Sequence, residues 1–227
     1  MSLYDNSYSK MMDSNPNPTR SPAPARAAHP GLLAFALALG AFTIGTAEFS
    51  AMPLLPLIAK AFGIGAPEAG HMISAYALGV VVGAPLIMLT TVNMRRRTLL
   101  VGLSLFVAIT HAASALVHDF QWLLLTRFLS GLPHGAFMGS AAVLASSSAP
   151  PGKRATAVAR VFLGLTIATI IGVPAATGLS QILGWQTAML LVAGLALVSA
   201  ICIARFAPST PVPPGGGPLK ELRALAS

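Results

Sequence analysis

The sequence predicts an all-α membrane protein, a bundle of six transmembrane helices. Apolar residues make up 55 % of its 227 residues and charged residues only 9 %, with a mean hydropathy of +0.74. Soluble domains carry about 25 % charged residues, so this chain has too few charges to cover a surface that faces water. Residues 161–204 contain no charged side chain at all. These observations argue against a soluble enzyme and a nucleic-acid-binding domain, and they indicate a lipid bilayer as the surroundings.

The first four spans are separated by charged or Gly/Pro-rich segments. A membrane helix needs about 20 mostly apolar residues. The first span contains one acid, Glu48, and a Gly/Pro loop at residues 63–67 follows it. Three arginines at 95–97 end the second span, and Asp119 marks the turn after the third. We expect these spans at residues 32–58, within 69–94, at 98–118 and at about 121–146, the last with Arg127 inside it.

The uncharged run 161–204 must belong to two spans. As one helix it would be about 66 Å long at 1.5 Å per residue, whereas the hydrocarbon core of a bilayer is about 30 Å thick. The polar segment 184–186 (Gly-Trp-Gln) is the break nearest its middle. We therefore expect a fifth span at about 155–183 and a sixth at 185–206. Both are expected to be helices, because backbone groups in lipid must bond within their own span.

The chain divides into one bundle and two polar ends. Residues 1–30 predict a disordered cytoplasmic tail, residues 31–207 the bundle, and residues 208–227 a Pro/Gly-rich cytoplasmic linker. No nucleotide-binding or Ser/His/Asp pattern is present, the five histidines are scattered, and Cys202 is the single cysteine. We therefore expect no cofactor, no metal, no disulfide within the chain, no nucleic-acid partner and no enzymatic activity.

The distribution of cations predicts the orientation. Cytoplasmic loops of membrane proteins carry an excess of Lys and Arg. With the amino terminus inside, twelve of the 14 Lys and Arg residues fall on the cytoplasmic side; Lys60 lies outside and Arg127 lies within a span. We therefore expect a multi-pass protein of the inner (plasma) membrane with both termini in the cytoplasm.

Two charged side chains fall inside spans, Glu48 and Arg127. An acid at membrane depth is costly and normally faces a cavity or a partner. Counting residues from the outer ends of the spans places the two at depths about 6 Å apart, within reach of an arginine side chain. Desolvation favours a neutral carboxyl group, and a nearby arginine favours the carboxylate. We therefore predict Glu48 and Arg127 as proton-coupling residues; the alternatives are an ion pair that only fixes helix packing, and an Arg127 that snorkels to the outer surface.

Two further side chains are candidates for lining a substrate cavity, Tyr76 and His134. His134 lies beside Pro133 in the fourth span, where a proline bends the helix and frees a carbonyl group. Broken helices at membrane depth can mark binding sites. The alternative for both side chains is simple packing.

Small residues recur at intervals of four in the second, fourth and fifth spans. Such a stripe lets two helix backbones approach closely, which serves static packing and also permits sliding. We interpret the following residues as helix-packing motifs: Gly79 and Gly83, Gly131 and Gly135, and Gly164 and Gly172, with Pro174 and Gly178 after them.

Several segments resemble the amino-terminal half of the major facilitator superfamily. The closest likeness is to its drug:proton antiporter and sugar-efflux branch, of the arabinose-efflux-permease type. Residues 45–49 (Gly-Thr-Ala-Glu-Phe) with 53–56 (Pro-Leu-Leu-Pro) look like the first helix of that branch. Residues 127–135 resemble its fourth-helix arginine motif, 164–178 its fifth-helix exporter motif, and 184–185 its outer loop before helix six.

The resemblance implies a twelve-helix fold of which this chain supplies six helices. The family has twelve helices in two six-helix halves, each built from two inverted three-helix repeats, with substrate bound between the halves. By this likeness the chain corresponds to one half and ends in the central loop, so that a second half or a second copy is implied as a partner.

One loop departs from the family pattern. Between helices two and three the family usually reads Gly-x-Leu-x-Asp-Arg-x-Gly-Arg-Arg. Here Thr91, Val92 and Met94 stand at the Asp, Arg and second Gly positions, and only the basic run 95–97 remains. The departure leaves open whether the segment from Thr91 to Arg97 acts as a gate.

The resemblance and the intramembrane charges together predict a secondary transporter. We expect efflux of drugs, sugars or other small molecules by proton-coupled antiport, with protons, a small-molecule substrate and the lipid bilayer as partners. The alternatives are a truncated membrane fragment that transports nothing, and a half-transporter that works only as a dimer.

Overall fold

A computed structural model describes residues 29–209, and every regular element within that range is a helix. The predicted tail 1–30 and linker 208–227 lie almost entirely outside the described residues. In chain order the elements are α2 (Pro30–Phe49), α3 (Ala51–Phe62), α4 (Ala66–Ala69), α5 (His71–Thr90), α6 (Arg96–Leu116), α7 (Phe120–Gly131), α8 (Pro133–Ser148), α9 (Arg154–Ile167), the π-helix η1 (Ala168–Gly172), α10 (Val173–Leu183) and α11 (Gln186–Phe206).

Six helical segments of the described residues are long and apolar enough to cross a membrane. Each overlaps one predicted span, so the prediction of an all-α membrane protein with six transmembrane helices is confirmed. The predicted loop 63–67 is shorter than expected, because α4 begins inside it at Ala66. The six segments are Pro30–Phe49, Ala66–Thr90, Arg96–Leu116, Phe120–Ser148, Arg154–Leu183 and Gln186–Phe206.

The first predicted span is divided into α2 and α3 by a proline. Pro53 has no N–H to bond the carbonyl group of Phe49, and its ring crowds that carbonyl. The α-helix therefore ends at Phe49 and resumes after Ser50, whose own N–H still reaches back into α2. Pro56 and Pro85 lie inside α3 and α5, where the helix continues through them.

The fourth and fifth spans are also interrupted at prolines. Pro133 cannot bond the carbonyl group of Leu129, which instead accepts the N–H of Leu132 at 3.2 Å, and this break separates α7 from α8. In the fifth span Pro174 lies two residues after the end of the wider π-helical turn Ala168–Gly172. Such turns commonly accommodate a residue that does not fit the regular helical bonding pattern.

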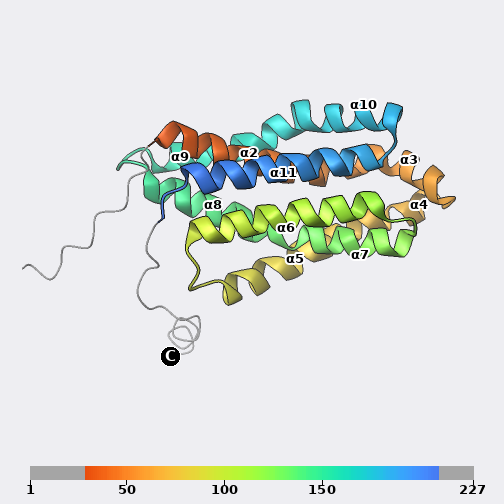
Figure 1. Cartoon of the computed structure of the whole chain (residues 1–227), viewed down its shortest axis with the longest axis horizontal. Helices are drawn as coiled ribbons and strands as arrows, with labels where there is room; N and C mark the ends of the chain where they lie inside the picture. The colour runs from red at the N-terminus through yellow and green to blue at the C-terminus, as the bar shows by residue number, and fades with distance from the viewer. Residues whose placement is uncertain (1–28, 210–227) are drawn as a thin grey trace, which may run out of the picture.

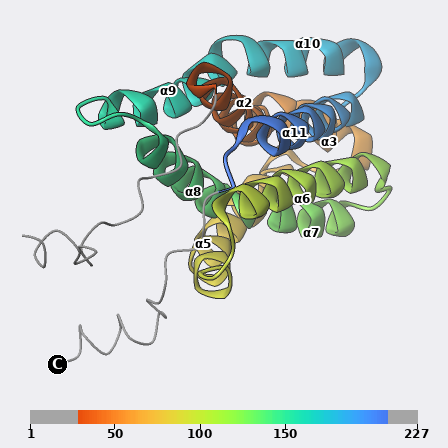
Figure 2. The ribbon, with the colours of Figure 1, turned by 60° about the vertical axis from the view of Figure 1, so that its left-hand side comes forward.

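The helices run along the long axis of the molecule, and the described chain begins and ends at the same end of the bundle (Figure 1). The pair α6 and α11 makes the most extensive helix contact, α2 packs on α9 and α11, and α5 packs on α7 and α8. Both views place α9 and α10 on the opposite side of the bundle from α5 and α7 (Figure 2). The segments containing α5 and α9–α10 are the least covered by other helices. In the 18-residue apolar stretch of these two segments 22 % of the residues are buried, against 44–56 % in the other four segments.

The apolar core lies in two large clusters at the two ends of the bundle. One contains Leu37, Phe137 and Ile203, and the other contains Leu54 and Trp185. A small cluster of Ala and Val side chains lies between them. The middle of the bundle is therefore the place where the core is thinnest.

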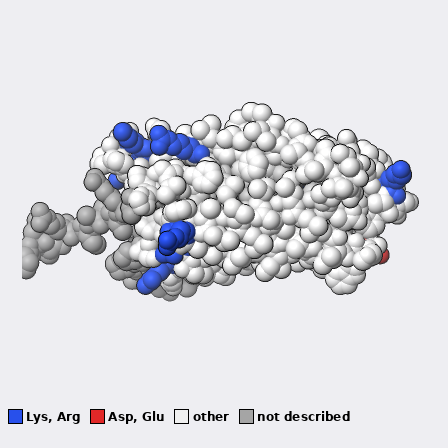
Figure 3. Space-filling view, turned by 45° about the horizontal axis from the view of Figure 1, so that its top comes forward, with Lys and Arg blue, Asp and Glu red and all other residues white. Residues whose placement is uncertain are grey.

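Charged side chains gather at the two ends of the bundle. Figure 3 shows a broad face without visible charge, cations at the end where the described chain begins and ends, and charges of both signs at the other end. Lys60 lies in the last turn of α3. The cations of the first end come from the α5–α6 and α8–α9 connections and from the neighbouring helix ends: Arg95, Arg96, Arg97, Lys153, Arg154, Arg160 and Arg205.

Glycines of α5, α7 and α8 lie where helices meet. A Cβ atom added to Gly79, Gly83 or Gly131 would collide with backbone atoms of the facing helix, and one on Gly135 would lie 2.8 Å from the Cβ of Ala84. Because a backbone cannot move as a side chain tip can, these positions set how closely α5 approaches α7 and α8.

The fifth span approaches α2 in the same way over only part of its length. A Cβ on Gly164 would collide with the backbone of α2, and one on Gly172 would collide with the Thr46 side chain. Pro174, the second residue of α10, follows this contact. Gly178 differs, because nothing lies within 4 Å of a Cβ placed on it, so it packs against no other helix within residues 29–209.

The basic loop between α5 and α6 is fastened to two other helices. Arg97 donates to the carbonyl group of Ala204 in the last turns of α11 and, at 3.0 Å, to the hydroxyl of Ser209. Arg96 donates to the hydroxyl of Ser140 in α8 at 3.4 Å. A cation near a helix carboxyl end is favourable, because the helix dipole is negative there. Arg96 and Arg97 therefore anchor this loop to α8 and to the end of α11.

We expect Gly83→Ala to destabilise the bundle, because its methyl group must displace the backbone of Leu132. Overpacking of this kind typically costs about 1–3 kcal/mol. The matched control is Gly178→Ala, which adds the same methyl group in open space and should raise the midpoint slightly, because alanine is favoured over glycine inside a helix. Thermal unfolding in detergent, followed by circular dichroism, compares the two; equal midpoints for both variants would contradict the packing role of Gly83.

Candidate functional site

Four helices each contribute one polar side chain to the middle of the bundle. They are Glu48 of α2, Tyr76 of α5, Arg127 of α7 and His134 of α8. All four are side chains that the sequence predicts to be functional. Glu48 precedes the break between α2 and α3, and Arg127 and His134 flank the break at Leu132. The interruptions caused by proline thus lie beside the residues of the candidate site.

Arg127 is the anchor of this cluster. Its side chain is fully buried, with 1 % of the residue exposed, so it does not snorkel to the surface. Both terminal nitrogens donate to the carbonyl oxygen of Ala47 at 3.3 Å, and the guanidinium carbon lies 4.6 Å from the centre of the Tyr76 ring. Its Nε has no hydrogen-bond partner in the described part of the chain. One carbonyl group and one aromatic face compensate only part of the free energy that burying the guanidinium charge costs.

Glu48 and Arg127, which the sequence places within reach of each other, form no direct ion pair in the described structure. The carboxylate of Glu48 instead lies 3.7 Å from Nδ1 of His134, the one ion pair found within residues 29–209. The reason is rotational: Arg127 reaches the backbone at Ala47, whereas the next side chain, Glu48, projects about 100° further around the helix. The two charges share one cluster without touching.

The nitrogen Nδ1 of His134 is the shared atom of the site. The hydroxyl of Tyr76 lies 3.1 Å from it and a carboxylate oxygen of Glu48 lies 3.7 Å from it, so the two groups compete for the single hydrogen-bonding site of this nitrogen. When the imidazole is neutral with its proton on Nε2, Nδ1 accepts the tyrosine proton; when it is protonated, Nδ1 donates to the carboxylate or to the tyrosine oxygen. The group can therefore hold one proton in more than one arrangement.

Burial decreases from Arg127 outward through the cluster. Tyr76 is 4 % exposed, whereas the side chains of His134 and Glu48 are 17 % and 35 % exposed. The Tyr76 ring stands edge-on to the His134 imidazole, with 6.2 Å between ring centres. Glu48 and His134 thus lie toward the outside of the described bundle, whereas Arg127 is enclosed within it.

The sequence contained a signal for the Glu48–His134 pair that residue depth alone did not reveal. His134 and Arg127 are seven residues apart, which places both on one face of a continuous helix. If Arg127 faces α2, His134 must face it as well. Within residues 29–209 no group of three or more His, Cys, Asp or Glu side chains could hold a metal ion.

Comparison with known proteins identifies the family. The family model of the Major Facilitator Superfamily matches residues 37–226. The inner membrane transport protein YdhP of Escherichia coli (strain K12) is 48 % identical over 168 residues, which cover 74 % of this chain and 43 % of YdhP. A chloramphenicol resistance protein of Streptomyces lividans is 34 % identical over 195 residues, covering 84 % of this chain and 50 % of that protein.

Solved structures agree on the fold. A crystal structure of a peptide transporter POT in complex with sulfate superposes with a TM-score of 0.70 at 14 % identity, covering 86 % of this chain and 42 % of that one. The chain thus spans about half the length, or less, of the relatives it matches. The match to the family model covers most of the chain and agrees with the motifs at residues 45–49 and 127–135. This chain is therefore a member of the Major Facilitator Superfamily, and a multi-pass membrane protein of its transporter class rather than an enzyme.

Proposed function

We propose that the chain is the amino-terminal half of a proton-coupled exporter of small molecules, and that Glu48 and His134 hold the coupling proton. The observation that supports this best is the Glu48–His134–Tyr76 contact beside a buried Arg127, in the middle of the bundle and apart from the charged side chains at its two ends. An ionisable group inside a membrane span is expensive and is by default functional.

The proposed proton site rests on Glu48 being both intramembrane and accessible. Of the other acids that the structure describes, Glu68 lies in the first turn of the segment Ala66–Thr90 and Asp119 directly before α7, whereas Glu48 lies beside the break between α2 and α3. A carboxylate enclosed completely could not exchange protons, but about a third of its side chain is exposed. A proton that arrives at Glu48 weakens its attraction to His134.

Tyr76 and Arg127 serve in this proposal as the fixed part of the site. Arg127 holds α7 against the α2 backbone, and the Tyr76 hydroxyl offers His134 a second partner. When Glu48 is neutral, the Tyr76 contact replaces the lost ionic one. Ionised Glu48 thereby holds α2 against α8, whereas with Glu48 protonated the Tyr76 contact holds α5 against α8. We propose this change of helix contacts as the link to alternating access.

Export of a small molecule, rather than uptake, is proposed from the relatives. One of them is named as a chloramphenicol resistance protein. We propose drugs, sugars or similar small molecules as the substrate class, with Tyr76 and His134 at the edge of the substrate cavity.

A second half is the proposed partner. The chain spans 43 % of YdhP. The segments with α5 and with α9–α10 are only 22 % buried, so their outer faces can contact lipid, a second half or a second copy. The rival proposal is a fragment that folds but transports nothing. By the positive-inside rule we place both ends of the chain in the cytoplasm.

We expect Glu48→Gln to abolish transport driven by a pH gradient, because the amide keeps the size and hydrogen bonding of the side chain but cannot titrate. The measurement is substrate export by proteoliposomes that contain the chain together with a second half. Glu68→Gln is the matched control and should export normally. Wild-type pH dependence in Glu48→Gln would place the coupling elsewhere.

Two variants separate the roles of the cluster. His134→Gln removes a titrating group, so the dependence of transport on pH should become less steep. Tyr76→Phe keeps the ring under Arg127 and removes only the hydroxyl, so it should slow transport while leaving that steepness in place. Identical pH profiles for His134→Gln and the wild type would remove His134 from the proton site.

The orientation can be tested with a thiol reagent that does not cross membranes. In a Cys202→Ala background, Arg96→Cys should stay unlabelled in intact cells, and Lys60→Cys should be labelled. Labelling of position 96 from outside would reverse the proposed topology.

A further inference from the structure

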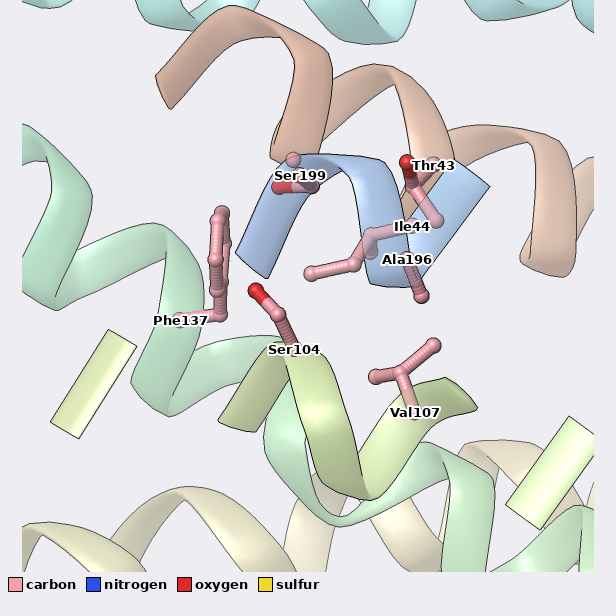
Figure 4. A pocket seen from close by; sticks show the side chains of 8 residues that line it. Thr43, Ile44, Ser104, Val107, Phe137, Ala196 and Ser199 are labelled. Atoms are coloured by element: carbon pink, nitrogen blue, oxygen red, sulfur yellow. The ribbon is translucent and has the colours of Figure 1, made fainter. Parts of the chain in front are cut away.

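A small hollow lies inside the bundle between α2, α6, α8 and α11, away from the polar cluster. Its volume is about 10 Å³. The walls are mostly apolar, and three hydroxyl-bearing side chains, Thr43, Ser104 and Ser199, share them with the side chains of Ile44, Val107, Phe137 and Ala196 and with Gly40 (Figure 4).

Two of these hydroxyls have no protein partner. Ser104 is 4 % exposed and Ser199 is 1 % exposed, and neither Oγ atom forms a hydrogen bond with any described residue. In Figure 4 the Ser104 hydroxyl points away from α6, toward the side chains of Phe137 and Ser199. An uncompensated buried hydroxyl typically costs about 1–3 kcal/mol.

Other buried hydroxyls of the same helices behave differently. Thr43 donates to the carbonyl group of Leu39, and Ser114 to that of Thr110, each within its own helix at 2.8 Å. Back-bonding of this kind is the usual way for Ser and Thr to be satisfied inside a helix. That Ser104 and Ser199 both turn away from it, into the same hollow, indicates a common partner there.

We propose that a single ordered water molecule binds in this hollow and bridges Ser104 of α6 to Ser199 of α11. One water needs about 10–15 Å³ and two to four polar partners. The two serine hydroxyls supply two partners, and the Thr43 hydroxyl, whose proton is used on Leu39, retains lone pairs that can accept a third bond. The apolar walls offer the water no competing partner.

The position of this water ties three helices together. Gly40 leaves the room for it, since a Cβ there would lie 2.9 Å from the Ser199 hydroxyl and would collide with the Phe137 ring. The water would join α2, which carries Glu48, to the pair α6 and α11. The inference does not depend on the proposed transport function.

The direction in which alanine substitutions shift the unfolding midpoint tests the proposal. If the water is bound, Ser104→Ala and Ser199→Ala each remove one of its partners and should lower the unfolding midpoint by about 2–4 °C. The double variant should lose less than the sum of the two, because the second change removes a hydroxyl that the first has already left unpaired. If no water is bound, each alanine removes an unsatisfied hydroxyl, and the midpoint should stay or rise.

A matched control separates coupling through the water from unrelated effects. Ser114→Ala is the same change on the same helix, about 15 Å along it from Ser104. At that distance its effect should add to that of Ser199→Ala. Additivity of Ser104→Ala with Ser199→Ala as well would overturn the bridge.

A direct readout uses X-ray hydroxyl-radical footprinting of the full 227-residue chain in detergent. Radicals formed from a bound water modify the nearest side chain, so Phe137 should be labelled although it is only 1 % exposed. Labelling should fall to background in the Ser104→Ala/Ser199→Ala double variant. Background labelling of Phe137 in the wild type would overturn the proposal, whatever the unfolding midpoints.

Discussion

Every backbone N–H and C=O group in the hydrocarbon of a bilayer must find a partner in the protein itself. The helix is the local solution to that constraint, and the bundle uses it wherever it can. The exceptions occur where proline has no N–H to offer, after Phe49, at Leu132 and next to the π-helical turn. Two of these three exceptions lie beside the polar cluster. Irregular backbone and the polar side chains of the cluster therefore occur together, at the same depth in the bundle.

The existence and approximate limits of the six spans could be predicted from sequence, because hydropathy sums over about 20 residues and errors average out. The break within the first span was harder to place, although Pro53 and Pro56 indicated it. A proline tells where a bond is lost but not whether the helix bends or stops. Pro53 and Pro133 interrupt their helices, whereas Pro85 lies within a continuous one.

The members of the candidate site could be predicted, but their pairing could not. Depth in the membrane follows from counting residues, and by this count Glu48 and Arg127 lie within reach of each other. The rotation of each helix about its own axis does not follow from counting. One residue turns the helix by about 100°, which is the difference between Arg127 meeting the Ala47 carbonyl and meeting the Glu48 carboxylate. Counting does explain why Gly178 faces open space while Gly164 touches a neighbour, because Gly178 is six residues from Gly172 and so lies off the row of small residues spaced by four.

The enclosed position of Arg127 has an electrical consequence. A guanidinium stays charged in proteins, and here it is fixed to the α2 backbone, so its charge can cross the field of a membrane only together with the helices that hold it. With His134 protonated, as its ionic contact with Glu48 requires, the cluster carries one positive charge while Glu48 is ionised and two once Glu48 is protonated. A unit charge that moves through a potential of 100 mV changes in energy by about 2.3 kcal/mol. On the proposed mechanism, the membrane voltage would therefore act more strongly on the form in which Glu48 is protonated than on the form in which Glu48 is ionised.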